Sequence, residues 1–243
     1  MLKLLHAGFS RLWKTRLFWV AADLLVVIGA AIPVKYFLDN RSGASAWTPD
    51  TACFLYANLV PILLSVLTAL FIGSEYSDGT MRNKCIVGHR RGSIYLANLL
   101  VCMAAGVFLC AAYLIPYLCL ALPLLGSFTA SAQTVLLFIA LTLALSFAFV
   151  SCFTLTAMLT QSKAHTAAAC ILLVFSLLLA GVYITSALSE PEDLAGYSYT
   201  ENGVTVKEPE AKNPNYVGGT KRQVYEFMRD FTPVRSGAFL TTF

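Results

Sequence analysis

Charged residues are scarce in this sequence, and their scarcity excludes an ordinary soluble domain. Of the 243 residues only 12% are Asp, Glu, Lys or Arg, whereas 58% are hydrophobic and the mean hydropathy is +0.70. Soluble domains carry about 25% charged residues on average. A chain with so little charge needs lipid around much of its surface, so we expect an integral membrane protein.

The sequence also lacks the motifs on which many enzymes depend. There is no Gly-x-x-x-x-Gly-Lys-Ser/Thr phosphate loop for ATP, no His-Glu-x-x-His metal motif and no Gly-x-Ser-x-Gly elbow. None of the seven cysteines follows Cys170, and no Cys/His spacing suggests zinc. We therefore expect a non-catalytic subunit that holds no metal or cofactor of its own.

Five apolar runs are each long enough to cross a hydrocarbon core of roughly 30 Å. Because the backbone must satisfy its own hydrogen bonds in lipid, each run is predicted to be helical. We expect the third and fourth runs to be tilted or broken, and Pro61 and Pro116 to kink the spans in which they lie. The predicted fold is an all-α, polytopic transmembrane bundle, with spans near Leu17–Phe37, Ala52–Gly73, Ile94–Leu120, Gln133–Thr160 and His165–Leu188.

Lys and Arg gather on one side of these spans. The N-terminus carries four, the connection before the third span carries four and Lys163 adds one, whereas the short loops of the other side hold Lys35 and Arg41. By the positive-inside rule, this asymmetry places the N-terminus in the cytoplasm and the segment after Leu188 outside. We expect the membrane to be a bacterial plasma membrane.

The segments that flank the predicted transmembrane domain, residues 17–188, have their own character. In residues 1–16, apolar side chains recur at helical spacing, which predicts an amphipathic interfacial helix that is either a topology anchor or also a contact for a cytoplasmic partner. Residues 189–243 are richer in Pro, Gly and acidic residues and are predicted to be an extracytoplasmic segment. Within it we expect a hairpin around Val204–Val206 and a helix over 220–230.

Three polar residues inside the spans form a candidate intramembrane site: Asp23, Asn58 and Asn98. An ionised carboxylate at the centre of a span costs roughly 2.5–3.5 kcal/mol on insertion scales. Asp23 is therefore expected either to pair with a cation or a hydroxyl for structural reasons, or to contact a substrate or gate. The two asparagines can hydrogen-bond between helices.

The connection between the second and third spans carries the most information. Asp78 and Gly79 offer a turn, Thr80 is expected to cap a short helix over about 80–88, and Gly88 supplies its end. The helix is basic and predicted to lie along the membrane. A solvated positive loop that touches lipid headgroups would explain the cations, but not the order of Glu75, Gly79 and Thr80.

The motif Glu75-Tyr76-x-x-Gly79-Thr80-x-Arg82, followed by Gly88-x-Arg90-Arg91 and Tyr95, gives the chain a family resemblance. It resembles the ABC type-2 permeases, the membrane subunits of many bacterial exporters, and in particular those of bacitracin- and lantibiotic-type resistance systems. The resemblance implies that the short helix is a coupling helix that docks into a separate cytoplasmic ATPase subunit, where ATP and Mg are bound. The implied coupling residues are Glu75, Tyr76, Gly79, Thr80, Arg82, Lys84, Gly88, Arg90 and Arg91.

The resemblance also implies a function and a partner. The chain would pair with a second copy or a related permease and export amphipathic substrates such as antimicrobial peptides or drugs. Because family members usually have six spans with both termini inside, we expect a last span beyond the five. An alternative is a membrane scaffold or peptide sensor that recruits a cytoplasmic partner without transport. An intramembrane enzyme is disfavoured, since Asp23 has no second carboxylate within the spans.

Overall fold

The structure is a computed structural model that describes the chain except for residues 44–46, 195–197, 202–203, 208–210, 215 and 231–243. The described residues divide into two compact units, Met1–Ser176 and Leu177–Arg235, which meet within one long helix. Each unit is described by itself below.

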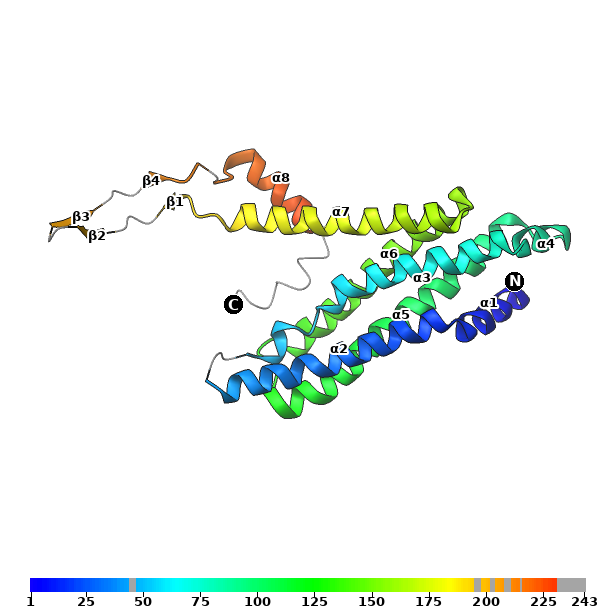
Figure 1. Cartoon of the computed structure of the whole chain (residues 1–243), viewed down its shortest axis with the longest axis horizontal. Helices are drawn as coiled ribbons and strands as arrows, with labels where there is room; N and C mark the ends of the chain where they lie inside the picture. Colours follow the sequence, from blue (N-terminus) through cyan, green and yellow to red (C-terminus); the bar gives the residue numbers. More distant parts are fainter. Residues whose placement is uncertain (44–46, 195–197, 202–203, 208–210, 215, 231–243) are drawn as a thin grey trace. The chain divides into compact units, whose positions relative to one another are not determined.

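Five helices are long and apolar enough to cross a membrane, as predicted. This confirms a helical protein with five helices able to span a membrane (Figure 1). The helices that correspond to the predicted third and fourth spans run without interruption, so of the two predicted alternatives, tilted or broken, a break is not found. The spans are α2 (Arg16–Arg41), α3 (Tyr56–Ser77, preceded by the short helix η1, Pro49–Thr51), α5 (Arg91–Leu125), α6 (Ala132–Thr160) and α7 (Lys163–Ser189).

Within the first unit, α5 is central and packs against α1, α2, α3 and α6. Its contact with α2 is close: a Cβ atom added to Gly29 would lie 2.6 Å from the carbonyl oxygen of Tyr113. The hydroxyl of Tyr56 on α3 forms a hydrogen bond with that of Thr142 on α6. Small residues and hydroxyl pairs of this kind are typical of helix contacts in membranes.

One end of the bundle is closed by an arrangement that we call the outer latch: Asp50, Thr129, Tyr117 and the Pro49 carbonyl. Asp50 is 1% exposed and accepts hydrogen bonds from the backbone N–H (2.8 Å) and hydroxyl (2.7 Å) of Thr129. The hydroxyl of Tyr117 donates to the carbonyl of Pro49. The latch therefore joins η1 to α5 and to the α5–α6 connection.

The predicted N-terminal helix is present as α1 (Leu2–Lys14). It turns into α2 at Thr15, whose backbone is extended. Leu4, Gly8 and Leu12 face the bundle, and a Cβ on Gly8 would lie 2.8 Å from Val101 of α5. Leu2, which the sequence places on the apolar face, is 83% exposed, so the packed face is set by close approach to α5 as well as by hydrophobicity.

The short helix after the second span is α4 (Thr80–Ile86). The residue that precedes it is Gly79, in the left-handed conformation with φ of 69°, so the expectation that Thr80 caps the helix is wrong. Thr80 is instead the first helical residue, and its hydroxyl donates to the carbonyl of Glu75 at 3.0 Å. Gly88, with φ of 92°, follows the helix as expected.

The second unit contains the end of α7, short strands and a last helix. Strands β2 (Ser198–Glu201) and β3 (Val204–Lys207) pair antiparallel, which confirms the predicted hairpin. Strands β1 (Asp193–Leu194) and β4 (Ala211–Lys212) also pair antiparallel. The predicted helix over 220–230 is present as α8 (Gly219–Asp230). Within this unit, Tyr183 and Tyr225 bring α7 and α8 together, with ring centroids 6.5 Å apart.

Candidate functional site

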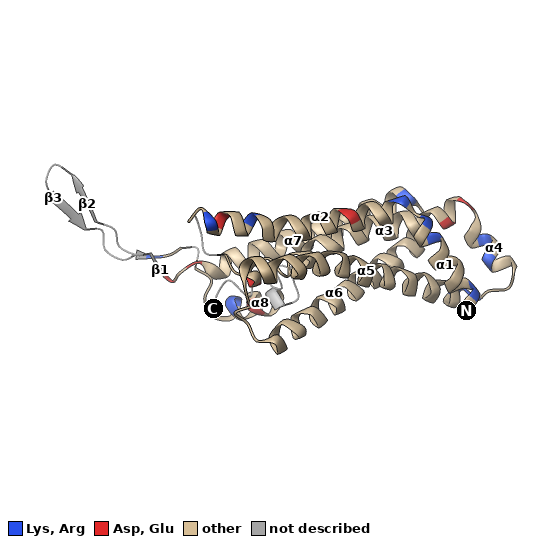
Figure 2. Cartoon of the chain, turned by 90° about the horizontal axis from the view of Figure 1, so that it is seen from below, with Lys and Arg blue, Asp and Glu red and all other residues tan. Residues whose placement is uncertain are grey.

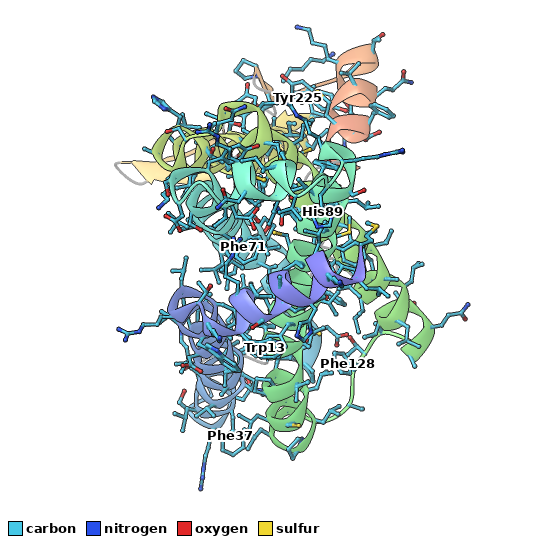
Figure 3. All side chains as sticks on the ribbon, turned by 90° about the vertical axis from the view of Figure 1, so that its right-hand side faces the viewer. Trp13, Phe37, Phe71, His89, Phe128 and Tyr225 are labelled. Carbon is cyan, nitrogen blue, oxygen red and sulfur yellow. The ribbon has the colours of Figure 1, made fainter. Side chains whose placement is uncertain are left out.

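Basic side chains of the first unit gather at the end of the bundle opposite the outer latch (Figure 2). This end is formed by α1, the start of α2, the end of α3, α4 and the start of α5. Seen end-on, α1 runs across the helix ends, with His89 near the end of α4 (Figure 3). The cations of this end are the ones that the positive-inside count assigns to the cytoplasm, among them Arg11, Lys14, Arg16, Arg82, Lys84, Arg90 and Arg91.

Three of its side chains meet around a single carboxylate. Glu75 lies in the last turn of α3, and its side chain is 1% exposed. Its Oε1 accepts from Arg11 Nη1 of α1 at 2.6 Å and also from Lys84 Nζ of α4. Its Oε2 accepts from Asn98 Nδ2 of α5 at 2.8 Å. We call Arg11, Glu75, Lys84 and Asn98 the Glu75 cluster, and it joins α1, α3, α4 and α5.

Arg11 holds α1 to α3 at a second point. Its Nη2 donates to the carbonyl of Phe71 at 2.9 Å, and its guanidinium carbon lies 3.9 Å from the centroid of the Phe71 ring. A planar guanidinium can bind a carboxylate, a carbonyl and an aromatic face together, which a lysine ammonium cannot do with the same geometry. Arg11 of α1 therefore binds two successive turns of α3.

The members of the Glu75 cluster differ in burial. This difference decides which member the cluster needs in order to stay together. The carboxylate is nearly inaccessible, whereas the side chains of Arg11 and Lys84 are 32% and 21% exposed. Removing one partner of a buried ion pair typically costs about 3–5 kcal/mol, because the other charge is left uncompensated. Each cation keeps some contact with solvent and shares its partner with the other cation. Glu75 is the member that the others cannot replace.

The turn before α4 explains the order of the motif residues. The left-handed conformation of Gly79 lets the chain reverse within two residues, so that Lys84 comes back to Glu75. The hydroxyl of Thr80 satisfies a carbonyl at the end of α3. Tyr76 points to α6, where its hydroxyl lies 3.3 Å from the carbonyl of Met158. Glu75, Gly79 and Thr80 thus fix the position of α4, whereas Tyr76 joins α3 to α6.

The end of α4 is apolar and uncovered in the described part of the chain. Ile86 is 72% exposed and Val87 is 76% exposed, although neither belongs to a helix that could span the membrane. The exposed cations Arg82 and Arg90 lie before and after them. An uncovered apolar pair with a basic surround is typical of a contact surface for another protein.

The structure does not bring the three predicted intramembrane polar residues together. Asn98 belongs to the Glu75 cluster. Asn58 lies in the first turn of α3, about 25 Å from Glu75 along the helix at 1.5 Å per residue. Asp23 is exposed on α2, and among the described residues it has no ion pair. Within the described chain, the cation partner expected for Asp23 is thus not found.

Two residues that hold the ends of the bundle together were not predicted from the sequence. Arg11 counted only as a topology signal, although its position beside the Leu4, Gly8 and Leu12 face indicates a cation at the edge of a packed helix. Asp50 was not singled out at all, because its partner Thr129 is distant in sequence and no spacing pattern links the two. A single sequence carries no signal for the second kind of contact.

In the part of the chain that the structure describes, no group of three or more His, Cys, Asp or Glu residues is placed to hold a metal ion. The seven cysteines are free thiols. A scan against models of known protein families found no match, and neither the curated proteins nor the solved structures gave one. Function is therefore inferred from the residues and their geometry.

Proposed function

We propose that this chain is the permease subunit of an ATP-driven exporter, with α4 as the coupling helix that receives the motion of a cytoplasmic ATPase subunit. The observation that carries the proposal is the Glu75 cluster. It ties a short helix outside the spans to three other helices through one buried carboxylate. The chain itself is proposed to be non-catalytic, with ATP and Mg bound on the ATPase.

The contacts of α4 suit the transmission of force. Lys84 links it to Glu75, and through Glu75 to Arg11 on α1 and Asn98 on α5. The turn through Asp78 and Gly79 is only two residues long, so α3 and α4 can move little relative to each other. A displacement of α4 therefore moves several helices at once. The displacement of a solvated loop would be absorbed by the loop and would not move the helices.

The exposed end of α4 supplies a docking surface for the ATPase. Ile86 and Val87 offer an apolar anchor, and Arg82 and Arg90 offer charge that an acidic groove would complement. Apolar anchors at the centre of an interface contribute most of its affinity, while charges at the rim set orientation and association rate. The proposed partner is thus an ATPase subunit that has an acidic cleft lined at its base by hydrophobic residues.

A second permease is the other proposed partner. Asp23 is exposed on α2 together with Val20 (62%) and Val27 (63%), within a helix apolar enough to span the membrane. A carboxylate on a lipid-facing surface is costly, so a face that carries one is better covered by protein. The proposed substrates, amphipathic peptides or drugs, rest on the sequence resemblance alone.

The composition of the native complex tests this proposal. The chain is purified in mild detergent from its native host, and the proteins that co-purify are identified and their stoichiometry measured by mass spectrometry. We expect an ATPase subunit with a phosphate loop and two permease chains per complex. A native complex without an ATPase would overturn the permease role and favour the scaffold or sensor alternative.

We further predict that Arg82→Glu and Gly79→Pro each uncouple ATP hydrolysis from export and leave membrane insertion intact. Pro fixes φ near −65°, which is incompatible with the φ of 69° at Gly79, and Glu reverses a charge on the docking face. ATPase activity and transport are measured together in proteoliposomes. The matched controls are Arg41→Glu and Gly43→Pro, a cation and a positive-φ glycine (φ 74°) away from α4. Unchanged transport in both test variants would contradict the coupling role.

A further inference from the structure

A cavity of about 670 Å³ lies beside the Glu75 cluster, between α4 and the ends of the helices that it joins. Its walls come from the end of α3, from α4, from the start of α5 and from the end of α6. Sites that enclose a small molecule usually have volumes of roughly 300–1,000 Å³. The cavity is therefore large enough for a headgroup and the first part of an acyl chain.

The walls combine two kinds of chemistry. Met81, Ile94 and Met158 give an apolar lining from three different helices, and Met81 and Ile94 are buried within the unit. Arg82 of α4 and Arg91 of α5 also line the cavity. The lining thus combines apolar and cationic residues.

Neither arginine has an acidic partner among the described residues. The ion pairs of the described chain are Arg11–Glu75, Lys84–Glu75 and Arg222–Glu226. The carboxylate nearest in sequence to Arg82 is Asp78, and it makes a hydrogen bond with the hydroxyl of Ser77. Two guanidinium groups beside an apolar cavity match an anion that carries a hydrocarbon chain, and guanidinium binds phosphate oxygens with two parallel hydrogen bonds.

We propose that this cavity binds one anionic phospholipid of the membrane leaflet at the basic end of the bundle, with its phosphate between Arg82 and Arg91 and the start of an acyl chain against Met81, Ile94 and Met158. Lipids of this class attract basic segments at the cytoplasmic surface. The bound lipid joins α4 to α5 on the side of α4 that the cavity occupies, in parallel with Lys84 and Glu75. Arg82 also belongs to the docking surface proposed above, so this inference is tested on the chain alone, without an ATPase.

Cys85 provides a reporter within the cavity wall. It lines the cavity and is an exposed free thiol. The full chain, purified without any ATPase, is placed in nanodiscs of phosphatidylcholine with or without phosphatidylglycerol of the same acyl chains. The rate of Cys85 alkylation by the uncharged reagent N-ethylmaleimide is followed by mass spectrometry.

We expect phosphatidylglycerol to slow alkylation of Cys85 by roughly tenfold, which corresponds to about one charge-assisted hydrogen bond. The double variant Arg82→Gln/Arg91→Gln should lose this protection. The matched control Arg90→Gln, which removes a neighbouring cation that does not line the cavity, should keep it. Each variant is compared with itself in the two lipids. Any effect of a substitution on the reactivity of the Cys85 thiol therefore cancels.

Three results would overturn the proposal. If phosphatidylcholine protected Cys85 from alkylation equally well, the anionic headgroup would have no part in binding. If inorganic phosphate at millimolar concentration protected Cys85 equally well, the apolar wall would have no part in binding. Loss of protection in Arg90→Gln to the same extent as in the double variant would indicate a diffuse surface effect. Native mass spectrometry of the chain in detergent, which counts retained phosphatidylglycerol, keeps the test decisive if alkylation is too slow to measure.

Discussion

Glu75 combines near-complete burial with three hydrogen bonds to side chains from three other helices. A carboxylate in such a position is stabilising only while its partners stay in place, because the penalty for an uncompensated buried charge exceeds the net gain from the pair. At the scale of single residues, the cluster is thus sensitive to small chemical changes. An amide in place of the carboxylate would bring a new donor toward the Arg11, Lys84 and Asn98 donors.

We predict that Glu75→Gln lowers the free energy of unfolding by about 1–3 kcal/mol, since it leaves the partly exposed cations Arg11 and Lys84 without a counter-charge. The midpoint of thermal unfolding in detergent micelles measures the effect. Asp78→Asn is the matched control, because Asp78 is an exposed carboxylate three residues away and outside the cluster. Equal midpoints for Glu75→Gln and the unmodified chain would show that the ion pairs contribute nothing net.

The sequence predicted which residues belong to this region but not how they meet. Glu75, Gly79 and Thr80 were singled out, and the positive φ at Gly79 follows from local chemistry. The contact with Arg11 spans 64 residues, and the contact with Asn98 spans 23. Contacts of this kind depend on how whole helices pack, which the periodicity of one sequence does not encode.

At the scale of elements, the contact between α2 and α5 is set by a glycine. The space beside Gly29 is filled by the carbonyl oxygen of Tyr113, which is backbone and cannot move aside as a side chain can. Pro116 of α5 adds a second contact, 3.4 Å from the position of an added Cβ. The two helices can approach so closely only because Gly29 has no side chain.

We predict that Gly29→Ala pushes α2 and α5 apart and lowers the midpoint of thermal unfolding, even though alanine is the better helix former by about 1 kcal/mol. Gly92→Ala is the control: Gly92 also lies in α5, and nothing lies within 4 Å of its added Cβ. The control should leave the midpoint unchanged or raise it. A midpoint for Gly29→Ala as high as that for Gly92→Ala would contradict the close contact.

Elements were predicted better than contacts. The five apolar helices follow from run length and composition, and the hairpin and α8 follow from turn signals and helical periodicity. Of the predicted alternatives for the third span, tilted or broken, no break is found in α5, because a proline inside a membrane helix can be accommodated by its neighbours, so that Pro116 and Pro123 lie within one helix of 35 residues. The start of α4 was misplaced by one residue, since Gly79 and not Thr80 precedes it.

At the scale of the bundle, the two ends of the first unit are held together by different chemistry. The outer latch uses hydroxyl and backbone donors around Asp50, whereas the other end uses two ion pairs around Glu75. The basic end collects the cations that the positive-inside rule assigns to the cytoplasm. The orientation proposed from these cations stays a prediction.

We predict that Cys85 faces the cytoplasm and that α8 lies outside. In intact cells, a membrane-impermeant maleimide should label Gln223→Cys in a Cys85→Ser background, because Gln223 is exposed on α8. Cys85 in the unmodified chain should react with the same reagent only after the cells are permeabilised. The opposite pattern would invert the topology and would place α4 out of reach of a cytoplasmic ATPase.

The sharing of one carboxylate oxygen by Arg11 and Lys84 has a kinetic consequence. When α4 moves, Lys84 can leave Glu75 while Arg11 still neutralises it, so the barrier to this step is lower than for a lone buried pair. Helix displacements of this size take place in microseconds to milliseconds. If α4 couples the chain to an ATPase, the pace of the transport cycle is then set by nucleotide turnover on that subunit, and α4 re-equilibrates many times within each turnover.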